Sequence, residues 1–129
     1  LRHHGWRLLD PKPASRTPSA YRAFIQGSYA EICIAKSGYV ESRCGWFSDR
    51  SACYLASGRP VVAQDTGFGR ALPVGEGLLA FGDTAEAVSA ADAVCANYED
   101  HRAAARSIAE EHLDSDRVLT RLLEAVGAT

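Results

Sequence analysis

Short apolar runs separated by polar, glycine-containing segments dominate the first part of the chain. Nearly continuous apolar stretches occur at residues 31–35, 60–64 and 77–81. A run of this kind, without alternation, is typical of a strand that is covered on both faces, as in a parallel sheet. Residues 6–10, which are followed by Pro11, predict a further short strand.

Two helical segments are predicted between these runs. Thr17, in a cap position, and the proline after it predict a helix that ends near Gly27. Ser48 predicts the cap of a second helix over residues 49–55, and Gly58 predicts its left-handed end. The other polar segments are expected to be loops: residues 12–19 and 36–47.

The C-terminal region, about residues 84–127, is predicted to be helical. Asp83 and Glu86 resemble a capping box at its start. The expected buried face of the first helix consists of Val88, Ala91, Val94, Cys95 and Tyr98. The last helix has an apolar stripe at helical spacing, formed by Val118, Leu119, Leu122, Leu123 and Val126.

The alternation of strands and helices predicts an α/β fold in one domain spanning residues 1–129. We expect a Rossmann-like parallel sheet of about three to four strands, with flanking helices and a helical C-terminal region. The composition, with 47% apolar and 23% charged residues, is that of a globular protein. A net charge of −2 provides no basic field for nucleic acid. No apolar run approaches the roughly 20 residues that a membrane span needs.

The four cysteines, Cys33, Cys44, Cys53 and Cys95, match no zinc-binding spacing, and we predict no bound metal. Cys33 lies in an apolar run, and Cys53 and Cys95 lie in helical patterns. We therefore interpret them as buried free thiols in a reducing compartment and expect a cytoplasmic protein.

Polar residues follow the predicted strands, where open α/β sheets bind their ligands. The start of the second helix predicts an anion site, because unpaired N–H groups and the helix dipole favour negative charge there. Its candidate residues are Gly45, Phe47, Ser48, Asp49, Arg50 and Ser51. The alternative is that Ser48 only caps the helix and Arg50 is solvated. Trp46 and Phe47 either fix the entry of the chain or line a sugar pocket.

A second candidate group follows the strand at residues 60–64. Asp65 and Thr66 can hydrogen-bond sugar hydroxyls, with Gly67 keeping the wall of the site low, and Lys36 can add positive charge. An ordinary turn explains the same residues, because Asp, Thr and Gly favour turns.

From about Trp6 to its end, the chain resembles the C-terminal half of a GT-B-fold glycosyltransferase. The resemblance combines three motifs: Leu55-Ala56-Ser57-Gly58-Arg59-Pro60-Val61-Val62, then Gln64-Asp65-Thr66-Gly67, then Gly75-Glu76-Gly77-Leu78-Leu79. It implies an incomplete half of a GT-B fold that binds a nucleotide-sugar donor. It also implies that the donor diphosphate lies at the helix beginning near Ser48, and that no bound metal or other cofactor is required.

The resemblance has departures with consequences. Many retaining members carry two glutamates seven residues apart, which would fall near Gly45 and Cys53, and neither position is acidic. The usual catalytic base comes from the other domain of such enzymes, so we expect no catalytic residue in this chain. The chain begins at Leu1 and contains no methionine, and we interpret it as a piece of a larger enzyme that is inactive alone.

Two other functions remain open. A binding or scaffold module on the same fold would explain the loss of both glutamates. An exposed edge of the strand at residues 31–35 would then let the chain form a homodimer. A different α/β domain of the phosphosugar or signalling type is the third hypothesis. A phospho-acceptor receiver is rejected, because it needs clustered acidic residues and a later lysine.

Overall fold

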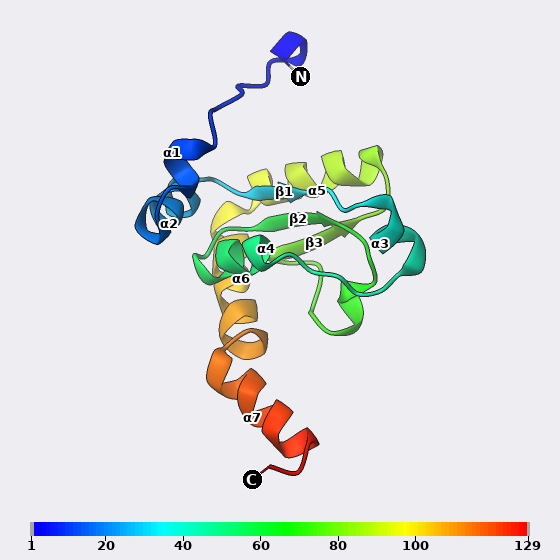
Figure 1. The fold of residues 1–129 in the computed structure, drawn as a ribbon. Coiled ribbons are helices and arrows are strands. Elements are labelled where there is room, and N and C mark those ends of the chain that lie inside the picture. The colour runs from blue at the N-terminus through cyan, green and yellow to red at the C-terminus, as the bar shows by residue number, and fades with distance from the viewer. Residues whose placement is uncertain (1, 129) are drawn as a thin grey trace.

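The computed structural model of the chain describes residues 2–128. Its centre is a parallel three-stranded sheet in the order β1-β2-β3, with β1 at Glu31–Cys33, β2 at Val61–Gln64 and β3 at Leu78–Phe81 (Figure 1). Glu31 is paired with Val61, and Val61 with Leu78. The predicted parallel sheet is confirmed, with three strands.

Helices flank the sheet and form the C-terminal region. The helices are η1 (Arg2–His4), α1 (Lys12–Ser15), α2 (Pro18–Gly27), α3 (Ser37–Ser42), α4 (Asp49–Ala56), η2 (Phe68–Arg70), α5 (Thr84–Ala96), α6 (Tyr98–His112) and α7 (Ser115–Ala125). The side chains of Thr17 and Asp83 accept hydrogen bonds from the N–H groups of Ala20 and Glu86, at 3.1 and 2.9 Å. Both predicted caps are therefore confirmed.

The two faces of the sheet are covered by different helices. On one face Val61 and Leu78 pack against α4, α6 and α2 through Leu55, Ile108 and Ile25. On the other face Val62, Leu79 and Phe81 pack against α5. Burial of these apolar side chains on both faces explains why the strands are continuously apolar in sequence.

Gly77 brings the start of β3 close to α6. Its φ is +72°, and a Cβ placed on it would lie 2.3 Å from the backbone nitrogen of Ala105. Its N–H donates a hydrogen bond of 3.0 Å to Nδ1 of His101, whose side chain is buried. Only glycine fits this left-handed, close backbone approach.

Three local expectations were wrong. Residues 6–10 form no strand, and their large apolar side chains are exposed. Residues 12–19 contain the short helix α1 and the first residues of α2, and residues 36–47 contain α3. A strand requires a neighbour to satisfy its backbone, and residues 6–10 have none within the described part of the chain.

The buried face of α5 also differs from the expected one. Ala90 and Val94 are buried, whereas Val88 and Cys95 are exposed. The helix is rich in alanine, so its apolar pattern does not define one face strongly. All four cysteines are free, but only Cys33 is buried, so the expectation of buried thiols was wrong for Cys53 as well.

Helix α7 extends away from the sheet (Figure 1). The stripe predicted from the sequence is present on it, but all its large apolar side chains are exposed: Val118, Leu119, Leu122, Leu123 and Val126. The helical C-terminal region is thus confirmed, and most of this last helix packs on nothing else in the described chain.

Candidate functional site

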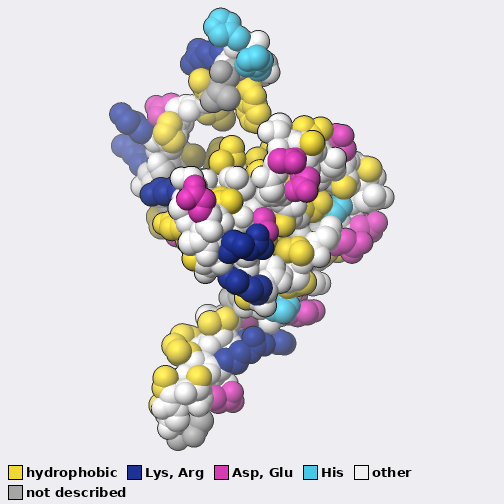
Figure 2. All heavy atoms as spheres, turned by 90° about the vertical axis from the view of Figure 1, so that its right-hand side faces the viewer, with side chains coloured by type: hydrophobic (Ala, Val, Ile, Leu, Met, Phe, Trp, Pro, Cys, Tyr) yellow, Lys and Arg dark blue, Asp and Glu magenta, His cyan; other side chains and the backbone are white. Residues whose placement is uncertain are grey.

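The carboxyl ends of the three strands lie together at one end of the sheet, on the right in Figure 1. The segments that follow β1 and β2 meet there, including α3 and the turn that precedes η2. Figure 2 views the molecule from this end and shows Lys and Arg side chains in the middle of the face, with Asp and Glu side chains nearby. This end is the candidate functional site.

Two loops at this end are fixed to each other by hydrogen bonds. The N–H of Gly45 donates to the carbonyl of Thr66 at 2.8 Å, and the Thr66 hydroxyl donates to the carbonyl of Trp46 at 2.5 Å. Gly67 has a φ of +90°, and a Cβ there would lie 3.0 Å from the carbonyl oxygen of Arg43. Residues 43–46 and 65–67, called the loop pair below, therefore form one rigid unit.

Within the loop pair, Thr66 and Asp65 have different surroundings. Thr66 is fully buried, and its hydroxyl holds the loops together. Asp65 accepts hydrogen bonds from the N–H of Gly67 at 2.7 Å and from the guanidinium of Arg43 at 3.1 Å. Its side chain is 31% exposed, so one carboxylate edge reaches the surface, unlike the Thr66 hydroxyl. Lys36 is exposed at the start of α3, on the same end of the molecule.

The N-terminus of α4 carries buried hydroxyl groups that do not cap the helix. Ser48 occupies the cap position and is buried, but its side chain makes no capping hydrogen bond. Ser51 is fully buried, and its Oγ has no partner among the described residues. Asp49 instead accepts a hydrogen bond of 2.9 Å from the N–H of Arg50. The Asp49 carboxylate thus supplies negative charge at this helix end.

The side chain of Arg50 contacts strand β1 and is not free for the phosphate contact expected from the sequence. Its guanidinium pairs with Glu31 and donates to Sγ of Cys33 at 3.5 Å, both on β1. The hydrogen bond to Glu31 raises the pKa of Arg50 above its usual value. Glu31 is only 5% exposed, and a buried carboxylate requires a charged partner. The ion pair with Glu31 explains why the Arg50 side chain is directed to β1. This direction cannot be predicted from the sequence.

A hollow of about 510 Å³ lies beside the loop pair and the N-terminus of α4. Four residues expected at the diphosphate line it: Gly45, Phe47, Ser48 and Asp49. Phe68 and Leu72 form an apolar wall, the end of α6 contributes His112, and α7 contributes Arg121. His112 and Arg121 are not predictable from the sequence, because no local pattern links the C-terminal helices to the sheet.

The aromatic residues of the entry loop pack on the protein. Trp46 stacks on Tyr39 with ring centroids 5.0 Å apart, and Phe47 lies 5.4 Å from Phe68. Both are half-buried against the core. Trp46 therefore helps to fix the entry of the chain, whereas Phe47 also borders the hollow.

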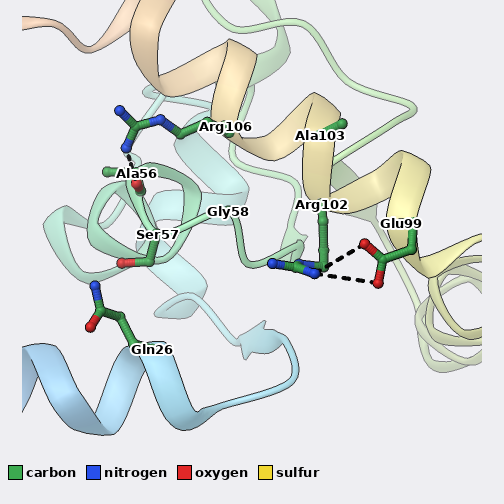
Figure 3. Close-up of a pocket in the computed structure, with 8 residues that line it drawn as sticks. All are labelled: Gln26, Ala56, Ser57, Gly58, Glu99, Arg102, Ala103 and Arg106. Atoms are coloured by element: carbon green, nitrogen blue, oxygen red, sulfur yellow. Dashed lines mark hydrogen bonds and ion pairs between the residues drawn. The ribbon is translucent and has the colours of Figure 1, made fainter.

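A second hollow, of about 470 Å³, lies at the opposite end of α4 and contains basic residues (Figure 3). The guanidinium of Arg106 donates to the carbonyl of Ala56 at the end of α4. Its Nε also donates to a carboxylate oxygen of Glu110 at 2.7 Å. Arg102 pairs with Glu99 at 3.0 Å. These contacts stabilise the helix end and the surface of α6, so the arginines serve structural roles.

Comparison with known proteins gives no assignment: no protein family, no curated protein and no solved structure matches the chain. Within residues 2–128, no cluster of three or more His, Cys, Asp or Glu side chains is arranged to hold a metal ion. None of the helices described is both long and apolar enough to span a bilayer.

Proposed function

We propose that the chain is the donor-binding portion of a GT-B-fold glycosyltransferase, which transfers a sugar from a nucleoside-diphosphate sugar to an acceptor. The observation that supports it is the position of the loop pair. It holds the N-terminus of α4, with its buried Ser48, at the carboxyl end of a parallel sheet. Ligands of open α/β sheets bind at this end.

The roles of the individual residues follow from their positions. The diphosphate binds at the N-terminus of α4, with Gly45 and Ser48 beside it, and it displaces the Asp49 carboxylate from the N–H of Arg50. Asp65 reaches the surface and takes sugar hydroxyls, and Thr66 and Gly67 hold the loop that carries it. Lys36 supplies positive charge. Arg121, on the far wall of the hollow, is a further basic group near the diphosphate.

A titration of the isotope-labelled chain with UDP, GDP, dTDP and their sugar conjugates tests this function. We expect saturable amide shifts centred on residues 47–51 and 65–67, with one base preferred. Amide spectra that do not change when any of these nucleotides is added to millimolar concentration would contradict donor binding by this chain.

A pair of glycine variants sharpens the titration. Gly67→Ala should weaken nucleotide binding at least about tenfold, because its Cβ would separate the loop pair. Gly69→Ala is the matched control, since a Cβ there would meet only Val74 at an ordinary 3.6 Å. Equal affinities of the two variants would show that the loop pair plays no part in binding.

A second function, a non-catalytic module that self-associates through an exposed sheet edge, is favoured by one specific observation. Ile32 and Ile34, on or just after the edge strand β1, are 51% and 76% exposed. Exposed apolar edges of sheets pair with other chains. This function predicts a homodimer, which analytical ultracentrifugation detects as a mass that rises with concentration to twice that of the chain.

A further inference from the structure

Strand β1 has one paired edge and one open edge. The N–H of Glu31 donates to the carbonyl of Pro60 on the side of β2, at 2.9 Å. The N–H and C=O groups of successive residues in a strand point to opposite edges, so the N–H and C=O of Ile32 point away from β2. No strand within residues 2–128 meets them there. The open edge thus offers both backbone groups and the exposed side chain of Ile32.

The segment Trp6–Asp10 has the complementary property. It has an apolar stretch that is typical of a strand, but its own N–H and C=O groups make no hydrogen bond to other backbone groups in the described chain. Trp6, Leu8 and Leu9 are 56%, 49% and 60% exposed. A hollow of about 550 Å³ lies between Leu9 and α2, so the segment is not packed tightly on its own chain.

One parallel register matches the segment to β1 in both charge and polarity. With Leu8 beside Ile32, the neighbouring pairs are Arg7 with Glu31 and Leu9 with Cys33. Side chains alternate between faces, so Arg7 would lie on the same face as Glu31. Glu31 is buried, and its Oε2 has no partner in the described structure, while Oε1 is held by Arg50. Arg7 would give this buried oxygen a cationic partner.

The position of the segment favours exchange between two chains. Helix α1 packs on α2, and the segment runs from α1 away from the sheet (Figure 1). In the parallel register Asp10 lies beyond the carboxyl end of β1, whereas α1, which starts two residues later at Lys12, lies at the other end of the strand, so the segment cannot pair with its own β1 unless α1 moves. A second copy can receive the segment without that change. Reciprocal exchange of one element is a common route to a symmetric dimer.

We propose that two copies of this chain form a dimer in which Trp6–Asp10 of each copy adds to the open edge of β1 in the other. The inference rests on the second proposed function, self-association through the sheet edge, and identifies the segment that fills this edge. The sheet of each copy then has four strands, and Ile32 is covered by Leu8.

Isotope-filtered NMR on a mixture of differently labelled full chains tests the contact directly. We expect intermolecular nuclear Overhauser effects between the methyl groups of Leu8 and Ile32. The same effects within a single chain only would overturn the exchange. Contacts of Ile32 with Ile32 of the second copy, without Leu8, would overturn it but retain an edge-paired dimer. A monomer at every concentration would overturn both the inference and the self-association on which it rests.

Two matched pairs of variants test the energetics by sedimentation. Leu8→Ala should raise the dimer dissociation constant at least about tenfold, whereas Leu122→Ala, at a similarly exposed leucine on α7, should leave it within about twofold. Arg7→Glu should weaken the dimer more than Arg2→Glu, which makes the same change of net charge outside the paired segment. Equal effects within either pair would contradict the proposed register.

Discussion

The two outer strands of the sheet, β3 and β1, are both edge strands, but helices pack on both faces of β3 and, on β1, mainly on the face of Glu31 and Cys33. Leu78 on β3 is fully buried, and Leu79 is 9% exposed, because α6 and α5 pack on the two faces of this strand. On β1, Ile32 is 51% exposed. Helix coverage, rather than the position of a strand in the sheet, thus decides how far the side chains of an outer strand are buried.

The largest expected loss of stability comes from Gly77, where the start of β3 lies close to α6. Gly77→Ala should lower the free energy of unfolding by about 4 kcal/mol, because overpacking against Ala105 adds to the cost of a left-handed alanine. Gly58→Ala is the control. It has a similar φ of +62° but meets no atom closer than 3.6 Å, so it should cost only about 1 kcal/mol. Urea unfolding of both variants measures the difference, and equal costs would contradict the tight contact between β3 and α6.

Truncation of one large side chain on each outer strand tests the comparison directly. Leu78→Ala should lower the free energy of unfolding by about 3 kcal/mol, because it leaves a cavity in the core. Ile32→Ala should change it by less than about 1 kcal/mol in the monomer, since half of the side chain is already in water. Similar losses, measured by urea unfolding at low protein concentration, would show that β1 is as well covered as β3.

A smaller effect is expected where β1 is tied to the C-terminal helices. The Tyr98 hydroxyl donates to the carbonyl of Tyr29 at 2.6 Å, and the two rings stack with centroids 3.7 Å apart. Tyr98→Phe removes this hydrogen bond and the one that the hydroxyl accepts from Arg59 at 3.1 Å, and it keeps the stack, so it should cost about 2 kcal/mol. Thermal unfolding measures this loss. An unchanged midpoint would mean that stacking alone holds the entry to β1.

Sequence patterns predicted the fold well where local signals were strong. The three apolar runs became strands, and the helix predicted over residues 49–55 is α4 at Asp49–Ala56. Residues 6–10 have a strand pattern too, but this pattern cannot say whether a neighbouring strand is available. The exposed stripe of α7 has the same cause: amphipathic spacing predicts an apolar face and not what covers it.

The candidate site was only partly predictable for a related reason. Glycine and turn residues located the loop pair, because Gly45 and Gly67 adopt left-handed conformations that their residue type favours. The directions of polar side chains depend on distant partners. Arg50 turns to Glu31, and the Thr66 hydroxyl turns to Trp46, and neither partner is a sequence neighbour.

The order of the strands in the sheet has a consequence for how the protein is made. Each strand pairs with the next strand along the chain, so β1, α4 and β2 can assemble on the ribosome as soon as they emerge. The burial of Leu78 and the fit of Gly77 must wait for α6, which is synthesised later. The better-covered outer strand of the sheet is therefore the last to be completed, and until it is added β2, which is central in the finished sheet, has an open edge.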